Sequence, residues 1–149
     1  MSNQNRATDK EELALATFSR LSRTVGMVRR SVYAGLSDTR LTESQVNVLE
    51  LLHNLGPLPQ KEIAKNLSVT GGNITMVVDN LQKRDLVERK RWPEDRRVVH
   101  VQLTDLGRET IESYIPLHIK KVMVAFDGLD PKEQKQLQSL CDKLVDSLN

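Results

Sequence analysis

The chain contains one cysteine and few aromatic residues, and both shortages narrow the classes of protein to which it can belong. A lone thiol, Cys141, excludes an internal disulfide framework and a cysteine-cluster metal site, as expected for a reducing compartment. Aromatic residues make up only 3% of the chain, against 38% hydrophobic and 28% charged residues. This composition is typical of a folded, soluble, helical protein.

Long uncharged apolar runs are missing as well. No stretch approaches the roughly 18 residues of a spanning helix, and the N-terminus is polar, without the apolar core of a signal peptide. We therefore expect a cytoplasmic protein with no membrane partner. With 149 residues the chain suits one domain. The net charge of +2 neither requires nor forbids nucleic-acid binding, so the distribution of charge along the chain must decide.

Constellations of catalytic residues are absent too. The sequence has no Ser/His/Asp, Cys/His, paired-carboxylate or glycine-rich phosphate-loop pattern in a plausible context. Its three histidines, His53, His100 and His118, are far apart and lack ligand spacing. We expect no catalytic site, no metal site and no cofactor.

Apolar residues at helical spacing are present throughout the N-terminal half. From about residue 11 to residue 36 they form one stripe, which predicts a long helix in need of a partner. Residues 1–9 are polar and predict a frayed terminus. Thr42 and Gln45 form a capping-box pattern at the start of a helix over 42–55, which ends at a Gly-Pro break.

A helix-turn-helix pattern follows. A short helix over 60–67 and a turn over 68–70 precede a helix that Thr70 caps and that extends to about Arg84. The period then changes to two, which predicts strands over 86–91 and 98–103 joined by a turn over 92–95. Thr104 can cap a helix to about Phe126, and Asp130 with Pro131 begins the last helix.

The 70–84 helix carries polar and small residues opposite its apolar face. Asn73 and Thr75 can hydrogen-bond base edges or phosphates, and Met76 can pack on a thymine methyl group. Gly71 and Gly72 permit backbone N–H groups to approach a phosphate closely, or alternatively they only relax a tight turn. The outward-facing residues of this helix are Gly72, Met76 and Lys83, flanked by Asn73, Thr75 and Asp79.

The predicted hairpin concentrates positive charge. Its basic residues are Arg89, Lys90, Arg91, Arg96 and Arg97, against the acidic Glu94 and Asp95. Arginine suits insertion into a narrow minor groove, and Asp95 can orient the Arg97 guanidinium. The alternative is an ordinary solvated charge run on a hairpin.

The order of these features resembles the MarR family (multiple antibiotic resistance regulators) over residues 11–148. The most specific match is Asp-x-Arg-x5-Leu-Thr-x-x-Gly at Asp95, Arg97, Leu103, Thr104 and Gly107, with Leu41-Thr42 in the usual place. The resemblance implies a mainly α fold with a small β-wing in a single domain, 1–149. It further implies a helical dimerisation region, 11–40 and 104–148, and a winged helix-turn-helix lobe, 41–103.

The resemblance also implies a function, that of a homodimeric repressor on a pseudo-palindromic double-stranded DNA operator, released by a small aromatic or phenolic effector. The 70–84 helix lies in the major groove and the wing, 86–103, in the minor groove. Arg97 is then the minor-groove residue and Arg96 a phosphate contact. The complete set of expected DNA-binding residues is Thr70, Gly71, Gly72, Asn73, Thr75, Met76, Lys83, Arg91, Asp95, Arg96 and Arg97.

Two positions depart from the family pattern. Asp85 stands where members usually have glycine after the recognition helix, so the turn there is expected to differ slightly. Met76 stands where many members carry arginine, so one polar contact is replaced by an apolar one or lost.

Three further residues have two interpretations each. We interpret Cys141 as a buried structural thiol, and the alternative is a redox sensor. Trp92 is expected to pack on the hairpin, and the alternative is stacking on DNA. Tyr33 is a candidate effector contact or an interface residue. At the level of function, a protein-interaction module is the main alternative, disfavoured by the basic wing, and the sequence does not distinguish repressor from activator.

Overall fold

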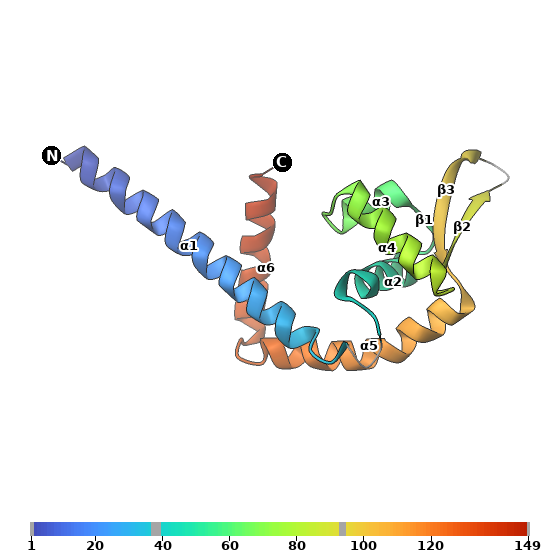
Figure 1. The fold of residues 1–149 in the computed structure, drawn as a ribbon. Helices are drawn as coiled ribbons and strands as arrows, with labels where there is room; N and C mark the ends of the chain where they lie inside the picture. Colours follow the sequence, from blue (N-terminus) through green and yellow to red (C-terminus); the bar gives the residue numbers. More distant parts are fainter. Residues whose placement is uncertain (1, 37–39, 93–94, 149) are drawn as a thin grey trace. The chain divides into compact units, whose positions relative to one another are not determined.

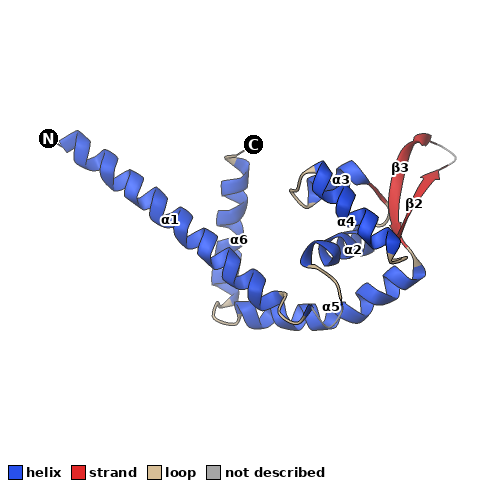
Figure 2. Ribbon diagram, in the orientation of Figure 1, coloured by secondary structure: helices blue, strands red, loops and turns tan. Residues whose placement is uncertain are grey.

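The computed structural model describes residues 2–36, 40–92 and 95–148, and the side chains of residues 2–7, 95 and 96 are outside the described part. Two compact units are formed, one by Met1–Ala34 with Ile119–Asn149 and the other by Gly35–His118. Figures 1 and 2 show their helices and strands. Helix α5 (Asp105–Phe126) belongs to both units, and Pro116 lies inside it just before the boundary.

The second unit contains the predicted helix-turn-helix. Helix α2 (Glu43–Leu55) begins at a complete capping box, in which the Gln45 N–H donates to Thr42 Oγ1 and the Thr42 N–H donates to Gln45 Oε1. Helices α3 (Gln60–Asn66) and α4 (Gly71–Lys83) follow. Ser68 has φ of 53°, so the turn between them uses the left-handed region at a serine rather than at a glycine. The predicted elements are confirmed.

The two predicted strands of the wing are confirmed, and a short third strand that the sequence did not predict completes the sheet. Strands β2 (Val87–Trp92) and β3 (Asp95–Leu103) pair antiparallel, and β1 (Leu58–Pro59) pairs with the other edge of β3. A two-residue strand is too short to show periodicity, and its proline is tolerated because β1 is an edge strand. The expected turn over 92–95 lies largely outside the described residues.

The core of this unit lies between α2, α3, α4, α5 and the sheet. Its fully buried side chains are Val46, Val48, Leu49, Ile63, Ile74, Val78, Leu81, Val87, Val101 and Ile111. At Gly107 the first turn of α5 packs directly on the backbone before β2. A Cβ at this position would overlap the carbonyl oxygen of Leu86, so only glycine fits. This contact gives a physical reason for the glycine of the Leu-Thr-x-x-Gly motif.

The first unit contains α1 (Ser2–Val32), the end of α5 and α6 (Pro131–Asp146). The prediction of a frayed segment over 1–9 was wrong, because α1 begins at Ser2. No proline or glycine interrupts this polar segment, so propensity continues the helix without an apolar stripe. Asp130 caps α6, accepting from the Lys132 and Glu133 N–H groups, as expected.

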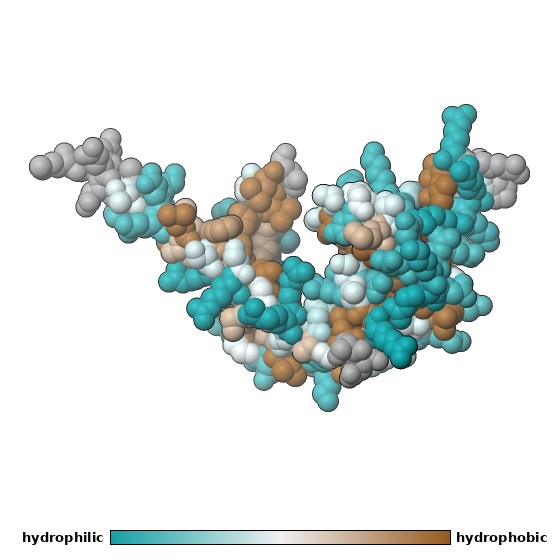
Figure 3. Space-filling view, in the orientation of Figure 1, coloured by the Kyte–Doolittle hydropathy of each residue, from teal (hydrophilic) through white to brown (hydrophobic). Residues whose placement is uncertain are grey.

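Large apolar side chains are exposed on both of these helices. On α6 no residue is buried, and Figure 3 shows hydrophobic patches along α1 and α6. The most exposed apolar side chains of the two helices are Leu13, Leu15, Phe18, Leu140 and Val145. Within the described part of the chain, none of the helices is both long enough and apolar enough to cross a membrane.

Candidate nucleic-acid interface

Helix α4 separates its apolar and polar residues cleanly. Ile74, Val77, Val78 and Leu81 are buried, whereas the side chain of Met76 is 61% exposed on the opposite face. Asn73, Thr75 and Lys83 are exposed as well. Thr70 is the N-cap, and its side chain accepts from the Asn73 N–H, as the sequence predicted. The helix therefore presents one accessible polar face that begins at a capped, positively polarised N-terminus.

Gly71 and Gly72 occupy the first turn of α4 and have no structural requirement within the chain. Neither has a positive φ, and a Cβ built on either one meets no atom within 4 Å. The turn before the helix is made by Ser68 instead. The interpretation that these glycines relax a tight turn therefore loses its support, since alanine would fit at both positions and favour the helix.

Thr75 has a hydroxyl group that is engaged within the protein. Its Oγ1 donates to the carbonyl of Gly71 over 2.9 Å and accepts from the side-chain amide of Gln60 over 2.6 Å. No local pattern in the sequence pointed to Gln60, because the contact joins the start of α3 to α4 through tertiary structure alone.

Arg89 is the centre of a hydrogen-bond network between β2, α3 and α4. Its Nη2 lies 2.6 Å from Asp79 Oδ1 and 3.1 Å from Gln60 Oε1, and its Nη1 lies 2.6 Å from Gln82 Oε1. In the sheet Arg89 pairs with Val101, a buried residue, and its side chain is 27% exposed. The sequence placed Arg89 and Asp79 near the interface but did not pair them. The alternation of side chains along β2 could have indicated that Arg89 faces inward, because Val87, two residues earlier, is buried.

Among the described side chains, the remaining basic residues of the wing lie toward solvent. Arg91 and Arg97 are exposed, on β2 and β3 respectively, whereas the side chains of Asp95 and Arg96 lie outside the described residues. Trp92 stacks on His100 with ring centroids 4.2 Å apart and an interplanar angle of 5°. The prediction that Trp92 packs on the hairpin is thus confirmed.

Helix α4 ends at a left-handed residue although no glycine is present. Asp85 has φ of 58°, its N–H donates to the Gln82 carbonyl, and its own carbonyl accepts from Thr104 Oγ1 over 2.6 Å. The turn was expected to differ because it lacks the usual glycine, but the φ of Asp85 shows no such difference. Aspartate adopts the left-handed region more easily than most side chains. Thr104 also caps α5 by accepting from the Gly107 N–H, as predicted.

Titratable side chains meet between α2 and α5 in the same unit. His118 Nε2 lies 3.6 Å from Glu50 Oε1, and the Tyr114 hydroxyl lies 3.4 Å from His118 Nδ1. A second pair, His53 Nε2 and Glu112 Oε1, is 3.3 Å apart. Burial raises the pKa of Glu50, against the opposing effect of His118 and then His53. Burial, and then Glu50, raises the pKa of Tyr114.

Among the described side chains, no group of three or more His, Cys, Asp or Glu is arranged to hold a metal ion.

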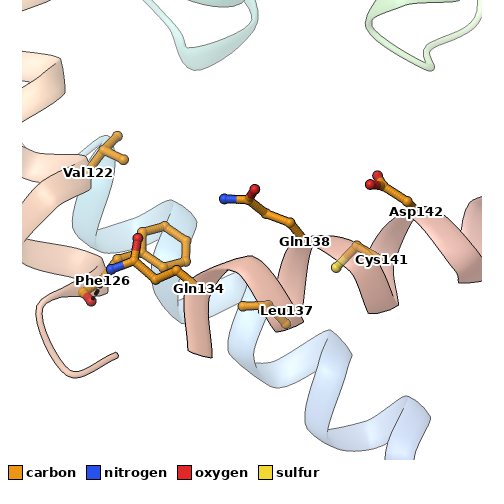
Figure 4. A pocket seen from close by; sticks show the side chains of 7 residues that line it. All are labelled: Val122, Phe126, Gln134, Leu137, Gln138, Cys141 and Asp142. Atoms are coloured by element: carbon orange, nitrogen blue, oxygen red, sulfur yellow. Dashed lines mark hydrogen bonds between the residues drawn. The ribbon is translucent and has the colours of Figure 1, made fainter. Parts of the chain in front are cut away.

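Cys141 was expected to be buried, and this expectation was wrong. Its thiol is exposed at a hollow of about 410 Å³ beside α6, which Figure 4 shows. The physical reason is that the described residues of the chain leave every residue of α6 unburied, including its apolar stripe. The residues lining the hollow are Val122, Phe126, Gln134, Leu137, Gln138, Cys141 and Asp142.

Tyr33, the candidate effector contact, is half-buried just after the end of α1.

Comparison with known proteins places this geometry in a family. Residues 41–99 match the MarR family model. The chain is similar to the transcriptional regulator MhqR of Bacillus subtilis, with 32% identity over 122 residues, 82% of this chain and 84% of MhqR. The chain belongs to the MarR family. It is also similar to YkoM of Bacillus subtilis, an uncharacterized HTH-type transcriptional regulator, with 40% identity over 96 residues, 64% of this chain and 62% of YkoM.

Solved structures of this family share the fold. BpsR of Bordetella bronchiseptica, whose DNA binding is regulated by 6-hydroxynicotinic acid, has 27% identity and a TM-score of 0.78, covering 86% of this chain and 91% of BpsR. A mutant of MarR from E. coli, solved with operator DNA, has 28% identity and a TM-score of 0.73, covering 84% of this chain and 93% of MarR. The expected winged-helix architecture of this MarR-family chain is therefore confirmed.

Proposed function

We propose that this MarR-family chain is a cytoplasmic, sequence-specific repressor that binds double-stranded DNA through α4 and the wing and is released by a small aromatic or phenolic effector. Helix α4 enters the major groove through Thr70, Gly71, Gly72, Asn73, Thr75, Met76 and Lys83. The wing reaches the minor groove through Arg97, while Arg91 and Arg96 hold phosphates and Asp95 orients Arg97. The protein acts by binding and catalyses no reaction.

The first turn of α4 carries this proposal. Two glycines stand at a helix N-terminus, where they weaken the helix although a Cβ at either position would lie in open space. Such a turn lets backbone N–H groups approach a phosphate, and the helix dipole attracts the anion. The basic side chains of the adjacent wing extend the same positive surface. Two similar structures support the same assignment: that of MarR with operator DNA, and that of BpsR, whose DNA binding is regulated by 6-hydroxynicotinic acid.

A second copy of the chain is the proposed partner of the first unit. The apolar stripes of α1 and α6 are exposed, including Phe18 at 69% and Leu140 at 57%. Exposed apolar patches of this kind mark interaction surfaces. A dimer spaces two recognition helices about one DNA turn apart, roughly 34 Å, and so fits a pseudo-palindromic operator. Sedimentation of the purified chain tests this point, because a monomer at micromolar concentration contradicts it.

An electrophoretic mobility-shift titration tests DNA binding directly. The protein is titrated on its own upstream DNA, wild type and Arg97→Ala, at two salt concentrations. We expect a specific shift that Arg97→Ala weakens and that falls by about 10³ to 10⁵ in affinity from low to moderate salt, if about 6 to 10 phosphates are neutralised. Affinity insensitive to salt, or absence of any specific site after a genome-wide selection, contradicts the proposal. Effectors are then screened by release of the shifted complex.

A further inference from the structure

The Thr75 hydroxyl is already used inside the protein. A hydroxyl has one donor hydrogen and two acceptor lone pairs. In Thr75 the hydrogen goes to the Gly71 carbonyl and one lone pair accepts from Gln60. The exposed side chain therefore retains its methyl group and a single lone pair for an outside partner. Hydrogen bonding to a helical carbonyl four residues earlier also selects one of the two rotamers open to a helical threonine.

Arg89 decides the orientation of the Gln60 amide. The Gln60 carbonyl oxygen accepts from Arg89 Nη2, so the NH₂ end of the same amide points to Thr75. Arg89 is itself held by Asp79 and Gln82 of α4. Four side chains from β2, α3 and α4 thus fix one rotamer on the recognition helix.

We propose that Arg89 is a positioning residue for DNA specificity: it acts through Gln60 to make Thr75 recognise the methyl group of a thymine. Thymine is the base that presents a methyl group in the major groove, and a threonine methyl is a fitting apolar contact for it. This inference rests on the proposed function. It narrows the expectation that the Thr75 hydroxyl bonds a base edge, because its hydrogen is not available to a base and only one lone pair remains to accept.

The charge of Arg89 leads to a second consequence. Its guanidinium is paired with the Asp79 carboxylate at 2.6 Å, so the pair as a whole adds no net positive charge to the DNA surface. The salt dependence of DNA affinity counts the phosphates that the protein neutralises. Because Asp79 and not a phosphate engages its guanidinium, substitution of Arg89 should leave the salt slope unchanged, in contrast to a wing arginine that contacts phosphate or enters the minor groove.

The test removes one methyl group from the DNA at a time. Operator duplexes selected with the wild-type protein are synthesised with single thymine-to-uracil replacements, and their affinities are measured for wild type, Thr75→Val and Thr75→Ser. At one thymine of each half-site we expect an approximately fourfold loss for the wild type, the factor that corresponds to one buried methyl group. Thr75→Val should keep this loss and Thr75→Ser should abolish it. A Thr75→Ser protein with the full loss overturns the proposal.

Two further variants test the role of Arg89. Arg89→Met should reduce the uracil effect while keeping the wild-type salt slope, and Arg97→Met, the comparison, should lower that slope by about one per protomer. A lower slope in Arg89→Met means that Arg89 contacts phosphate and overturns the proposal. Because Arg89→Met can destabilise the sheet, Gln60→Leu provides a second test that leaves the Arg89–Asp79 pair in place. It should also reduce the uracil effect, and an undiminished effect contradicts the mechanism.

The two proposals fail in different ways. If the wild-type protein binds no DNA sequence specifically, the proposed function is wrong and this inference with it. If the wild type binds its operator specifically but no uracil replacement changes the affinity, only the role of the Thr75 methyl group is wrong.

Discussion

Alanine at Gly71 and Gly72 should strengthen the fold and weaken DNA binding at the same time. In a helix interior, replacing glycine by alanine stabilises by about 1 kcal/mol. Gly71 and Gly72 lie in the first turn, where we expect each substitution to stabilise the fold by about half of that value. The double variant should gain about 1 kcal/mol, because neither new methyl group meets an atom within 4 Å. For a chain of this size that gain raises Tm by about 2–4 °C.

The effect on DNA has the opposite sign. The Cα–Cβ bond of a helical residue tilts toward the N-terminus, so methyl groups at these positions project to where a phosphate would lie. Losing one hydrogen bond to a charged group costs about 1.5–3 kcal/mol, or more than a tenfold loss of affinity. Mobility-shift titration measures this loss, and circular dichroism melting measures Tm on the same samples.

The control is Gly128→Ala, which adds a methyl group in equally open space outside α4 and the wing. It should leave DNA affinity unchanged. A Gly71→Ala, Gly72→Ala protein that is stabilised but binds its operator within twofold of wild type would refute the reasoning, since the glycines would then serve no approach to phosphate. A destabilised variant would refute the premise that α4 has no internal need for them.

Three other predictions concern stability and are measured by urea unfolding. Gly107→Ala should destabilise by about 3 kcal/mol, because its Cβ overlaps the Leu86 carbonyl, and a loss below about 1 kcal/mol contradicts that contact. Asp85→Gly should stabilise by about 0.5 kcal/mol by relieving the φ of 58°, and a less stable variant argues against left-handed strain. Because the pKa of Glu50 is raised on folding, the folded protein binds this proton more tightly. The stability gained in this way is present below pH 4.5 and is lost as the pH rises through the folded pKa. Glu50→Gln should therefore be more stable than wild type at pH 7, with the difference vanishing near pH 4, and equal stability at both pH values contradicts this.

Local signals in the sequence were sufficient for most of the elements. Helix α4 could be predicted because its buried set, Ile74 to Leu81, repeats at the helical period and Thr70 supplies a cap. The capping box of α2 and the Asp130 cap of α6 were found for the same reason, since each of them joins residues no more than three positions apart. The two-residue β1 left no such signal, because it pairs with β3 some forty residues later.

Burial on the terminal helices could not be predicted from periodicity alone. An apolar stripe indicates that a helix has a partner but not whether the partner belongs to the same chain. Cys141 lies on such a stripe and is nevertheless exposed, because the described part of the chain buries no residue of α6.

The sequence by itself therefore determined the order and type of the elements, the caps of α2, α4 and α6, and the polar face of the recognition helix, all of which depend on residues close together in the chain. Only the tertiary structure decided which polar groups on that face remain available. Arg89, Gln60 and Thr75 are brought together from β2, α3 and α4, and the Gln60 amide takes up an acceptor lone pair of the hydroxyl that the sequence assigned to DNA. Such contacts depend on folding, because they join residues up to 29 positions apart with no periodic relation.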